Sequence, residues 1–351
     1  MVLPKDFRWR QAGSELGRGG QAAILPVEDA QGVLEGKWAL KSLTSNASEK
    51  AYKRFYQEIE VIRSLDHPSV IRIVDYSKPD ANFHYYVMEF HEGAKSLRKL
   101  IQSGNNPYYG SALTTLDLFK RLVEVIDVTS RRDVVHRDLS PANVLVLQNQ
   151  SIKVIDFGLC QIEGGHAVTL ADEGVGTMYY MAPECEAGAE REIDFRSDLY
   201  SAGKIAWSAI TNQFAFSREA LVFAGKSMQS MFAADPSTWH LHHIFEGTIR
   251  ELPSNRFASS LDALRTCEKL EYVIKCGYPP LELLATRCPL CGFGEIQSHR
   301  NESIVKHPFR NSVEEVGIEP VQCDYCGFWL SVDNAKFTDT LGKRRQLESR
   351  R

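Results

Sequence analysis

Apolar and polar residues follow one pattern in the first quarter of the chain and another beyond it. Three short strand-like runs surround one amphipathic helical stretch at 48–64. The strand-like runs are 38–43, 70–76 and 84–90. Beyond about residue 95, apolar residues recur at helical spacing, most clearly in 116–128 and 198–210. The pattern predicts a small sheet-rich part with one helix, followed by a larger and mainly helical part.

A change in composition marks a boundary near residue 280. The segment Gly-Tyr-Pro-Pro at 277–280 interrupts helical continuity, and Cys, Gly and aromatic residues become more frequent after it. We expect a main domain over 7–272, with a smaller lobe to about 90 and a larger lobe from about 95. A small module over 284–332 and a basic, flexible tail over 333–351 are expected to follow.

Charge and hydropathy exclude several classes of protein. The 351-residue chain has 41 Lys and Arg against 45 Asp and Glu, a near balance that gives no argument for wrapping nucleic acid or coating anionic lipid. No apolar run approaches the roughly 18 residues that a membrane span requires. The first residues also lack the apolar core of a secretory signal. We expect a soluble, cytoplasmic protein without membrane contact.

The strongest chemical signal comes from two acids and one amide. The stretch at 135–143 reads Val-His-Arg-Asp-Leu-Ser-Pro-Ala-Asn, and Asp-Phe-Gly follows at 156–158. Phosphoryl transfer needs an acid that binds a metal ion, a second metal ligand, and an acid near the attacking hydroxyl. Asp156, Asn143 and Asp138 match these roles in that order.

Together with Gly-Thr-Met-Tyr-Tyr-Met-Ala-Pro-Glu at 176–184, these motifs resemble those of the eukaryotic-like (Hanks-type) serine/threonine protein kinases. The resemblance implies an α+β, two-lobed protein kinase fold. It implies ATP as the phosphoryl donor, with Mg²⁺ or Mn²⁺ bound by Asn143 and Asp156. It also implies a protein Ser or Thr hydroxyl as the acceptor, autophosphorylation included, with Asp138 accepting or orienting that hydroxyl.

The same resemblance implies a site for the phosphates of ATP. Residues 16–24 resemble the family's glycine-rich loop, whose backbone approaches the phosphates closely, although Ala22 replaces its third glycine. Lys41 ends an apolar strand and is expected to bind the α and β phosphates. Glu58 lies one helical turn from Ile62, so it can face inward and pair with Lys41. The loop residues assigned to the nucleotide are Leu16, Gly17, Gly19 and Gly20.

Adenine is expected to lie against the segment that follows the third strand-like run. By resemblance, the backbone from Glu89 to His91 forms the hinge that hydrogen-bonds the base. Ile24, Ala39 and Leu145 would enclose the base. Each of these three apolar residues, taken singly, fits an ordinary core position equally well.

Several further residues match supporting or regulatory positions of the family. Asp198 would brace the backbone of the catalytic loop, and Glu184 would pair with Arg256. Thr177 would contact the catalytic Asp, which favours Ser or Thr acceptors. Arg137 could receive a phosphate on Thr169, although Thr169 fits a merely exposed residue as well.

One position departs from the kinase pattern. Ser/Thr kinases commonly have Lys two residues after the catalytic Asp, whereas this chain has Ser140. The departure leaves two alternatives to an active protein kinase. One is a pseudokinase that binds nucleotide and acts as a scaffold through the second module. The other is a kinase of a non-protein acceptor.

Four of the eight cysteines form two Cys-x-x-Cys pairs, each followed by Gly. Such pairs present two thiolates to one metal ion, so the segment resembles a zinc ribbon. The expected Zn²⁺ ligands are Cys288, Cys291, Cys323 and Cys326. A redox dithiol, which needs only one pair, and a rubredoxin-type iron site are the alternatives. A protein or nucleic-acid partner is one expectation for the ribbon and basic tail; a merely solvated tail is the other.

Overall fold

The computed structural model describes residues 3–18, 21–158, 161–162, 179–186, 193–216, 226, 228–232, 234–276, 296–298 and 321–323. The chain divides into two compact units. The first unit comprises Met1–Asn105 and Glu124–Ser201. The second comprises Asn106–Val123 and Ala202–Arg351.

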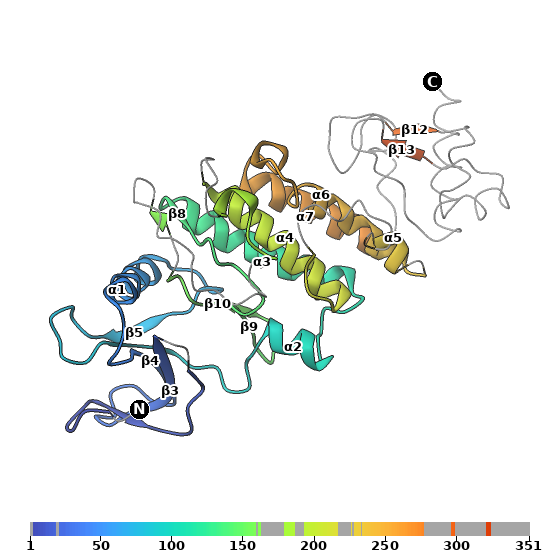
Figure 1. Ribbon diagram of the computed structural model, residues 1–351. Coiled ribbons are helices and arrows are strands. Elements are labelled where there is room, and N and C mark those ends of the chain that lie inside the picture. The colour runs from blue at the N-terminus through green and yellow to red at the C-terminus, as the bar shows by residue number, and fades with distance from the viewer. Residues whose placement is uncertain are drawn as a thin grey trace. The chain divides into compact units, whose positions relative to one another are not determined.

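An antiparallel sheet begins the first unit (Figure 1). Its strand order is β1-β3-β4-β6-β5, with β2 paired to β3. The strands are β1 (Trp9–Gln11), β2 (Gly17–Arg18), β3 (Ala22–Asp29), β4 (Trp38–Leu43), β5 (Ile73–Tyr76) and β6 (Tyr85–Glu89). The strands expected at 38–43 and 84–90 are therefore confirmed.

The strand expected at 70–76 begins later, at Ile73. The backbone before it pairs elsewhere, because the Val154 N–H donates to the Ser69 carbonyl at 2.7 Å and the Ile71 N–H donates to the Val154 carbonyl at 3.1 Å. The first residues of the apolar run therefore bond with Val154 on β10, and the later residues pair with β6. The pattern of the run alone does not reveal that division.

The two faces of the sheet carry different groups. In the strand register, Lys41 lies opposite Ile24 on one side and Tyr86 on the other, so these three residues share a face. Leu40 alternates with Lys41 and belongs to the other face. There it joins a buried apolar cluster whose members are Trp9, Leu25, Val27, Leu40 and Val87.

Helix α1 (Glu49–Ser64) confirms the helix predicted at 48–64 and lies beside the sheet (Figure 1). The Ser48 Oγ accepts a hydrogen bond from the Ala51 N–H at 3.2 Å, which caps the first turn. The helix buries Glu58 together with apolar neighbours such as Phe55, while Glu60 is exposed. The buried side of α1 therefore includes the carboxylate of Glu58.

The first unit also contains several short strands. The strands β7 (Lys95–Ser96), β9 (Val144–Val146) and β10 (Ile152–Val154) form a small sheet in the order β10-β9-β7. A separate pair joins β8 (Val134–Val135) to β11 (Gln161–Ile162). Helix α2 (Leu97–Ser103) follows β7, and the 3₁₀ turn η1 (Pro183–Cys185) precedes the next long helix.

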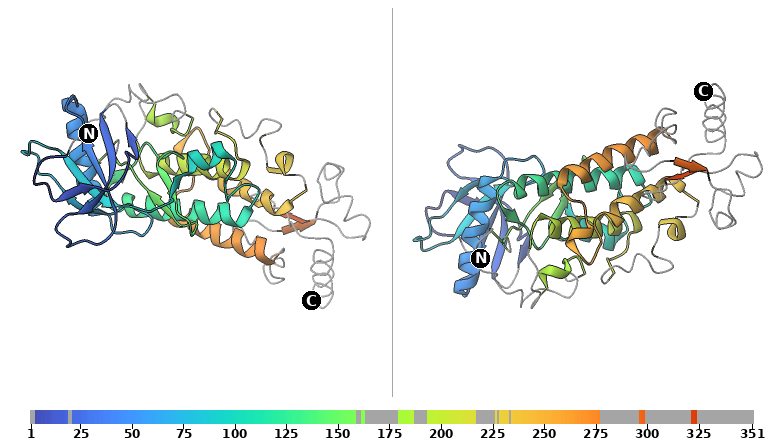
Figure 2. Two further views of the ribbon diagram at one scale, coloured as in Figure 1. Left: turned by 90° about the horizontal axis from the view of Figure 1, so that it is seen from below. Right: turned by 90° about the horizontal axis from the view of Figure 1, so that it is seen from above.

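Helices dominate the described part of the second unit. Helices α3 (Ala112–Ser130) and α4 (Phe195–Thr211) confirm the two predicted at 116–128 and 198–210, and each belongs only in part to this unit. Figures 1 and 2 show α3, α4 and α7 (Ser260–Cys276) running lengthwise together. The shorter elements are α5 (Met228–Met231), η3 (Pro236–Leu241), α6 (His242–Glu246) and η4 (Pro253–Asn255).

One glycine lets α4 pack closely in this unit. A Cβ added at Gly203 would lie 2.1 Å from the Thr248 Oγ1, which is closer than any side chain allows. The Thr248 hydroxyl is itself fixed by a 2.6 Å hydrogen bond to the Ile244 carbonyl. The glycine at this position is therefore required by the close approach of these two segments.

A two-stranded ladder joins β12 (Ile296–Ser298) and β13 (Val321–Cys323), with Ile296 opposite Cys323. Cys288, Cys291 and Cys326 lie outside the described residues, so the zinc ribbon stays a prediction. Within the described residues, no group of three or more His, Cys, Asp or Glu side chains could hold a metal ion. None of the helices described there is long and apolar enough to cross a membrane.

Candidate active site

A buried ion pair joins the sheet to α1. Lys41 on β4 places its Nζ 2.9 Å from Glu58 Oε1 and 2.8 Å from Glu58 Oε2. The two side chains are 13% and 2% exposed. The structure therefore contains the ion pair expected from the sequence.

The charges around this pair determine its ionisation. Burial by itself would lower the pKa of the Lys41 ammonium, but the Asp156 and Glu58 carboxylates raise that pKa well above its usual range. Burial raises the pKa of Glu58, and the opposing charge of Lys41 limits the rise. Lys41 therefore remains a cation that can face a polyphosphate.

The β9–β10 hairpin brings the two expected magnesium ligands together. Asn143 directly precedes β9 and Asp156 closely follows β10, and these strands pair Val144 with Val154. The Ile155 N–H donates to the Asn143 carbonyl at 3.0 Å and closes the same end of the hairpin. Two groups that are distant in sequence thus lie at one end of a small sheet.

Asn143 also links this hairpin to the catalytic loop. Its Nδ2 donates to the backbone carbonyl and to the Oδ2 of Asp138, both at 2.9 Å. The donor side of the amide is thereby directed at Asp138, so the amide Oδ1 points away from that carboxylate. Carboxylate and amide oxygens are hard ligands of the kind that Mg²⁺ and Mn²⁺ prefer, and Asp156 and Asn143 fit that preference.

Asp156 stands next to the ion pair. Its Oδ1 lies 3.6 Å from Lys41 Nζ, and its side chain is 49% exposed. The positive charge of Lys41 lowers the pKa of Asp156, which is opposed by partial desolvation. Asp156 is therefore a carboxylate at neutral pH, with an accessible face for a cation.

The backbone at the site is held in an unusual conformation. Arg137 has φ 66° and Asp156 has φ 63°, both in the left-handed region that non-glycine residues rarely adopt. Asp198, 1% exposed, accepts hydrogen bonds from the His136 N–H at 2.7 Å and the Arg137 N–H at 2.9 Å. These bonds offset the strain directly before Asp138.

The ionisation of Asp198 reflects its burial. Desolvation raises the pKa of this carboxyl to about 6, against the opposing effect of the two N–H donors. Nearby, burial lowers the pKa of His136 to about 4, so this imidazole is neutral at pH 7. The His136 ring packs on Phe157 with centroids 4.5 Å apart, which joins the catalytic loop to the Asp-Phe-Gly segment.

The expected nucleotide residues are only partly described. Gly17 pairs with Ile24 across β2 and β3, and the Leu16 N–H donates to the Ile24 carbonyl at 2.9 Å. Ala39 is 4% exposed, and Leu145 is half-buried on β9. Gly19 and Gly20 lie outside the described residues.

Glu89, which is expected in the hinge, makes contacts that the sequence did not reveal. Its Oε1 lies 2.6 Å from Lys153 Nζ on β10, and its Oε2 lies 3.2 Å from His91 Nε2. The Glu89 N–H donates to the Arg72 carbonyl at 3.0 Å. An adenine contact at Glu89 would therefore use its carbonyl group.

The remaining expected positions are fixed to different degrees. Glu184 is 1% exposed and accepts a hydrogen bond from Ser197 Oγ at 2.7 Å. Arg256 is buried, and its Nε donates to the Arg250 carbonyl at 3.0 Å. The pairing of Glu184 with Arg256 stays a prediction. Thr169 and Thr177 lie outside the described residues, so the phosphate contact of Arg137 and the role of Thr177 also stay predictions.

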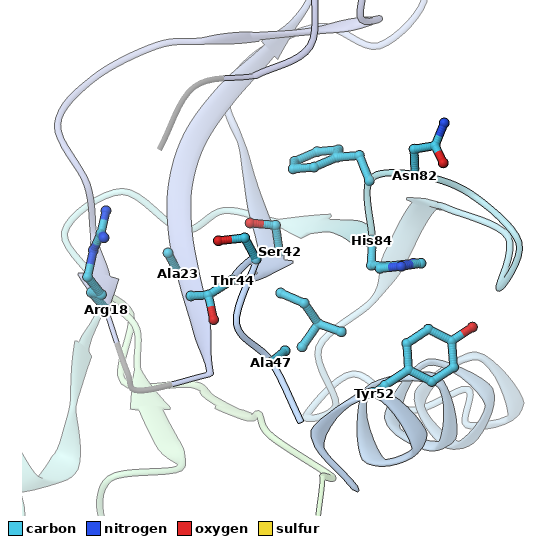
Figure 3. A pocket seen from close by; sticks show the side chains of 11 residues that line it. Arg18, Ala23, Ser42, Thr44, Ala47, Tyr52, Asn82 and His84 are labelled. Carbon is cyan, nitrogen blue, oxygen red and sulfur yellow. The ribbon is translucent and has the colours of Figure 1, made fainter. Parts of the chain in front are cut away.

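A pocket of about 660 Å³ opens elsewhere in the first unit (Figure 3). Ser42, Thr44, Tyr52 and His84 are among the residues that line it. Ser42 directly follows Lys41 on β4 and points to the opposite face of the sheet. Leu16, Gly17, Ile24 and Lys41 do not line this pocket, whereas Arg18 and Ala23 of the loop 16–24 do.

Ser140 permits a specific test of the departure from the kinase pattern. Within the described residues, its Oγ has no hydrogen-bond partner, and the residue is 2% exposed. Removal of an unpaired buried hydroxyl sacrifices no bond, so Ser140→Ala is expected to leave kcat within about twofold and the unfolding free energy within about 1 kcal/mol. Steady-state kinetics and urea denaturation measure both quantities. A large loss of kcat with unchanged stability would show that the hydroxyl contacts substrate.

Comparison with known proteins agrees with this geometry. The protein kinase domain profile matches residues 10–259. A probable serine/threonine-protein kinase of Streptomyces coelicolor is 31% identical over 208 residues, which cover 57% of this chain and 30% of that protein. Serine/threonine-protein kinase PrkC of Bacillus subtilis is 30% identical over 209 residues, covering 59% of this chain and 31% of PrkC.

A solved structure shows the same fold. The kinase domain of Mycobacterium tuberculosis PknI is matched with a TM-score of 0.56 and 21% identity, over 77% of this chain and 99% of that domain. The chain belongs to the protein kinase family, and its fold is the mixed helix-and-sheet fold of protein kinases. The matched segment spans about a third of the length of the curated relatives named above.

Proposed function

We propose that this chain is a serine/threonine protein kinase that transfers the γ-phosphoryl group of ATP to hydroxyls of proteins, itself included. The observation that carries the proposal is the cluster around Lys41. There the ion pair with Glu58, the carboxylate of Asp156 and the Asn143–Asp138 pair come together in one compact unit. The cluster supplies a cation for the phosphates, a carboxylate for a metal ion and an acid for the acceptor hydroxyl.

Each residue has a role set by its chemistry. Lys41, held by Glu58, offers its ammonium to the α and β phosphates. Asp156 and Asn143 would hold Mg²⁺ or Mn²⁺, which neutralises charge on the phosphates when it is bound. Asp138 orients the acceptor hydroxyl and takes its proton. The proposed kinase domain extends over residues 7–272, with a smaller lobe to about residue 90 and a larger lobe from about residue 95.

The names of the relatives support Ser or Thr hydroxyls as the acceptors. PrkC of Bacillus subtilis is named a serine/threonine-protein kinase, and the Streptomyces coelicolor relative is named a probable one. Purified protein is to be supplied with γ-labelled ATP and matched peptides that differ only in carrying Ser, Thr or Tyr. We expect labelling of the Ser and Thr peptides. Equal labelling of the Tyr peptide would contradict the acceptor class.

A pseudokinase is the second candidate, because Ser140 stands where kinases commonly have Lys. Lys41 contacts both Glu58 and Asp156, and Asn143 lies at the same end of the β9–β10 hairpin as Asp156. This arrangement favours turnover over mere nucleotide binding. The two candidates differ in one result. A pseudokinase binds ATP without labelling any acceptor, peptide or protein, the chain itself included.

We also propose that residues 284–332 form a zinc ribbon with Cys288, Cys291, Cys323 and Cys326 as ligands. The paired Cys-x-x-Cys spacing supports it, as does the β12–β13 ladder between the two pairs, which ends at Cys323. A contact surface for a protein or nucleic acid is the role proposed for this module.

The zinc proposal predicts one equivalent of zinc per chain. Elemental analysis of protein purified without added metal measures it, with iron measured in the same sample. Cys326→Ser is expected to lower zinc content strongly, because a closed structural site needs four ligands. The buried Cys267→Ser provides the control, since this cysteine belongs to α7. Iron in place of zinc, or full zinc content in Cys326→Ser, would refute the assignment.

A further inference from the structure

Tyr86 makes a contact that none of the roles assigned above includes. It lies on β6 directly opposite Lys41 on β4 and is 1% exposed. Its hydroxyl donates to Glu58 Oε1 at 3.0 Å. Its ring packs against Phe55, with centroids 5.3 Å apart, and lies 5.6 Å from the Lys41 Nζ.

The Glu58 carboxylate thus accepts hydrogen bonds from two side chains. Lys41 donates to both oxygens, and Tyr86 donates to Oε1 as well. Burial and the charge of Glu58 raise the pKa of Tyr86 well above its usual range, so the phenol keeps its proton. A buried carboxylate is stable only when such donors satisfy it.

Lys41 has too few N–H groups to bind Glu58 and two phosphate groups fully at the same time. An ammonium has three N–H groups, and two of them point at Glu58 in this structure. Contact with two phosphate groups requires at least two N–H groups, so Lys41 must release one of its bonds to Glu58. The Tyr86 hydroxyl can keep Oε1 satisfied during that exchange.

We propose that Tyr86 is a positioning residue that holds Glu58, and with it helix α1, in place while Lys41 binds the phosphates of the nucleotide. This inference rests on the proposed kinase activity for its consequence, although the contact itself does not depend on that activity. Sequence reasoning assigned Tyr86 only to the strand before the hinge. The signal available in the sequence was a hydroxyl-bearing aromatic residue within the strand-like run at 84–90.

A double-mutant cycle tests the proposal. Tyr86→Phe removes only the hydroxyl and is expected to lower kcat/KM for ATP about tenfold, since a hydrogen bond to a buried charge is lost. In a Glu58→Ala background, the same change is expected to alter kcat/KM less than about twofold, because the acceptor is already absent. Tyr85→Phe is the matched control, since the Tyr85 hydroxyl donates to Asp75 instead, at 3.3 Å.

A merely structural role for Tyr86 would give the same loss in both backgrounds, and that result overturns the proposal. An unchanged kcat/KM in Tyr86→Phe overturns it as well. If Glu58→Ala does not fold, Glu58→Leu fills the space without an acceptor and takes its place. If the wild-type chain transfers no phosphate, the proposed function fails. The contact can still be tested by measuring the midpoints of urea denaturation for the same four proteins of the double-mutant cycle. Equal midpoint shifts in both backgrounds then contradict the proposal.

Discussion

Asp156→Asn is expected to lower kcat for phosphoryl transfer about a thousandfold, which corresponds to about 4 kcal/mol of transition-state stabilisation. The substitution keeps the shape of the side chain and removes its charge. That charge is secure in the native protein, because Lys41 lowers the pKa of Asp156. The half-exposed carboxylate is also the strongest candidate ligand for a cation beside the ion pair.

The measurement is steady-state transfer from γ-labelled ATP at saturating Mg²⁺. Asp117→Asn serves as the control, since within the described residues Asp117 forms an exposed ion pair with Arg121 on α3. Its kcat is expected to match that of the wild-type protein. Transfer by Asp156→Asn at more than about a tenth of the wild-type rate would refute the metal role.

Asp138→Asn is expected to lower kcat by about a hundredfold to ten-thousandfold, the range that general acid–base catalysis supplies. The KM for ATP is expected to stay within about twofold, because the role proposed for Asp138 concerns the acceptor and not the nucleotide. The replacement side chain can still accept the hydrogen bond that Asn143 donates, so the loop keeps its support.

Initial rates over a range of ATP concentrations separate these two parameters for Asp138→Asn. Circular dichroism and urea denaturation check that the variant is folded. A folded variant with wild-type kcat would show that Asp138 is not the acid near the acceptor hydroxyl. A raised KM for ATP with unchanged kcat would move Asp138 into the nucleotide site instead.

The sequence predicted the elements that carry the site because their local patterns are strong. The apolar run at 38–43 and the amphipathic stretch at 48–64 are the strand and helix observed. Helical periodicity also placed Glu58 on the inward face of α1, where it pairs with Lys41. These features depend on residues close together in the chain, and periodicity reports them directly.

Contacts between distant elements were harder to predict. The bond of Tyr86 to Glu58 and the ion pair of Glu89 with Lys153 depend on strand register and on how hairpins pack. Register is a property of two strands together, so neither run of sequence contains it alone. The late start of β5 has the same origin, since residues 69–71 pair with Val154 instead of with β6.

The backbone strain at the site was also beyond sequence reasoning. Arg137 and Asp156 adopt left-handed conformations that their residue types disfavour, and Asp198 on the distant helix α4 compensates by accepting two backbone hydrogen bonds. Strain of this kind persists where tertiary contacts fix a functional group. The two strained positions here directly precede or contain groups assigned to the chemistry.

The most direct test of the account is a crystal structure of the chain with Mg²⁺ and a non-hydrolysable ATP analogue. The account predicts a metal ion held by the Asp156 carboxylate and the Asn143 amide oxygen, in contact with the phosphates. Lys41 is expected to reach the α and β phosphates while Glu58 still accepts a hydrogen bond from Tyr86. Nucleotide bound away from these residues, or Asp156 and Asn143 turned away from its phosphates, would contradict the account.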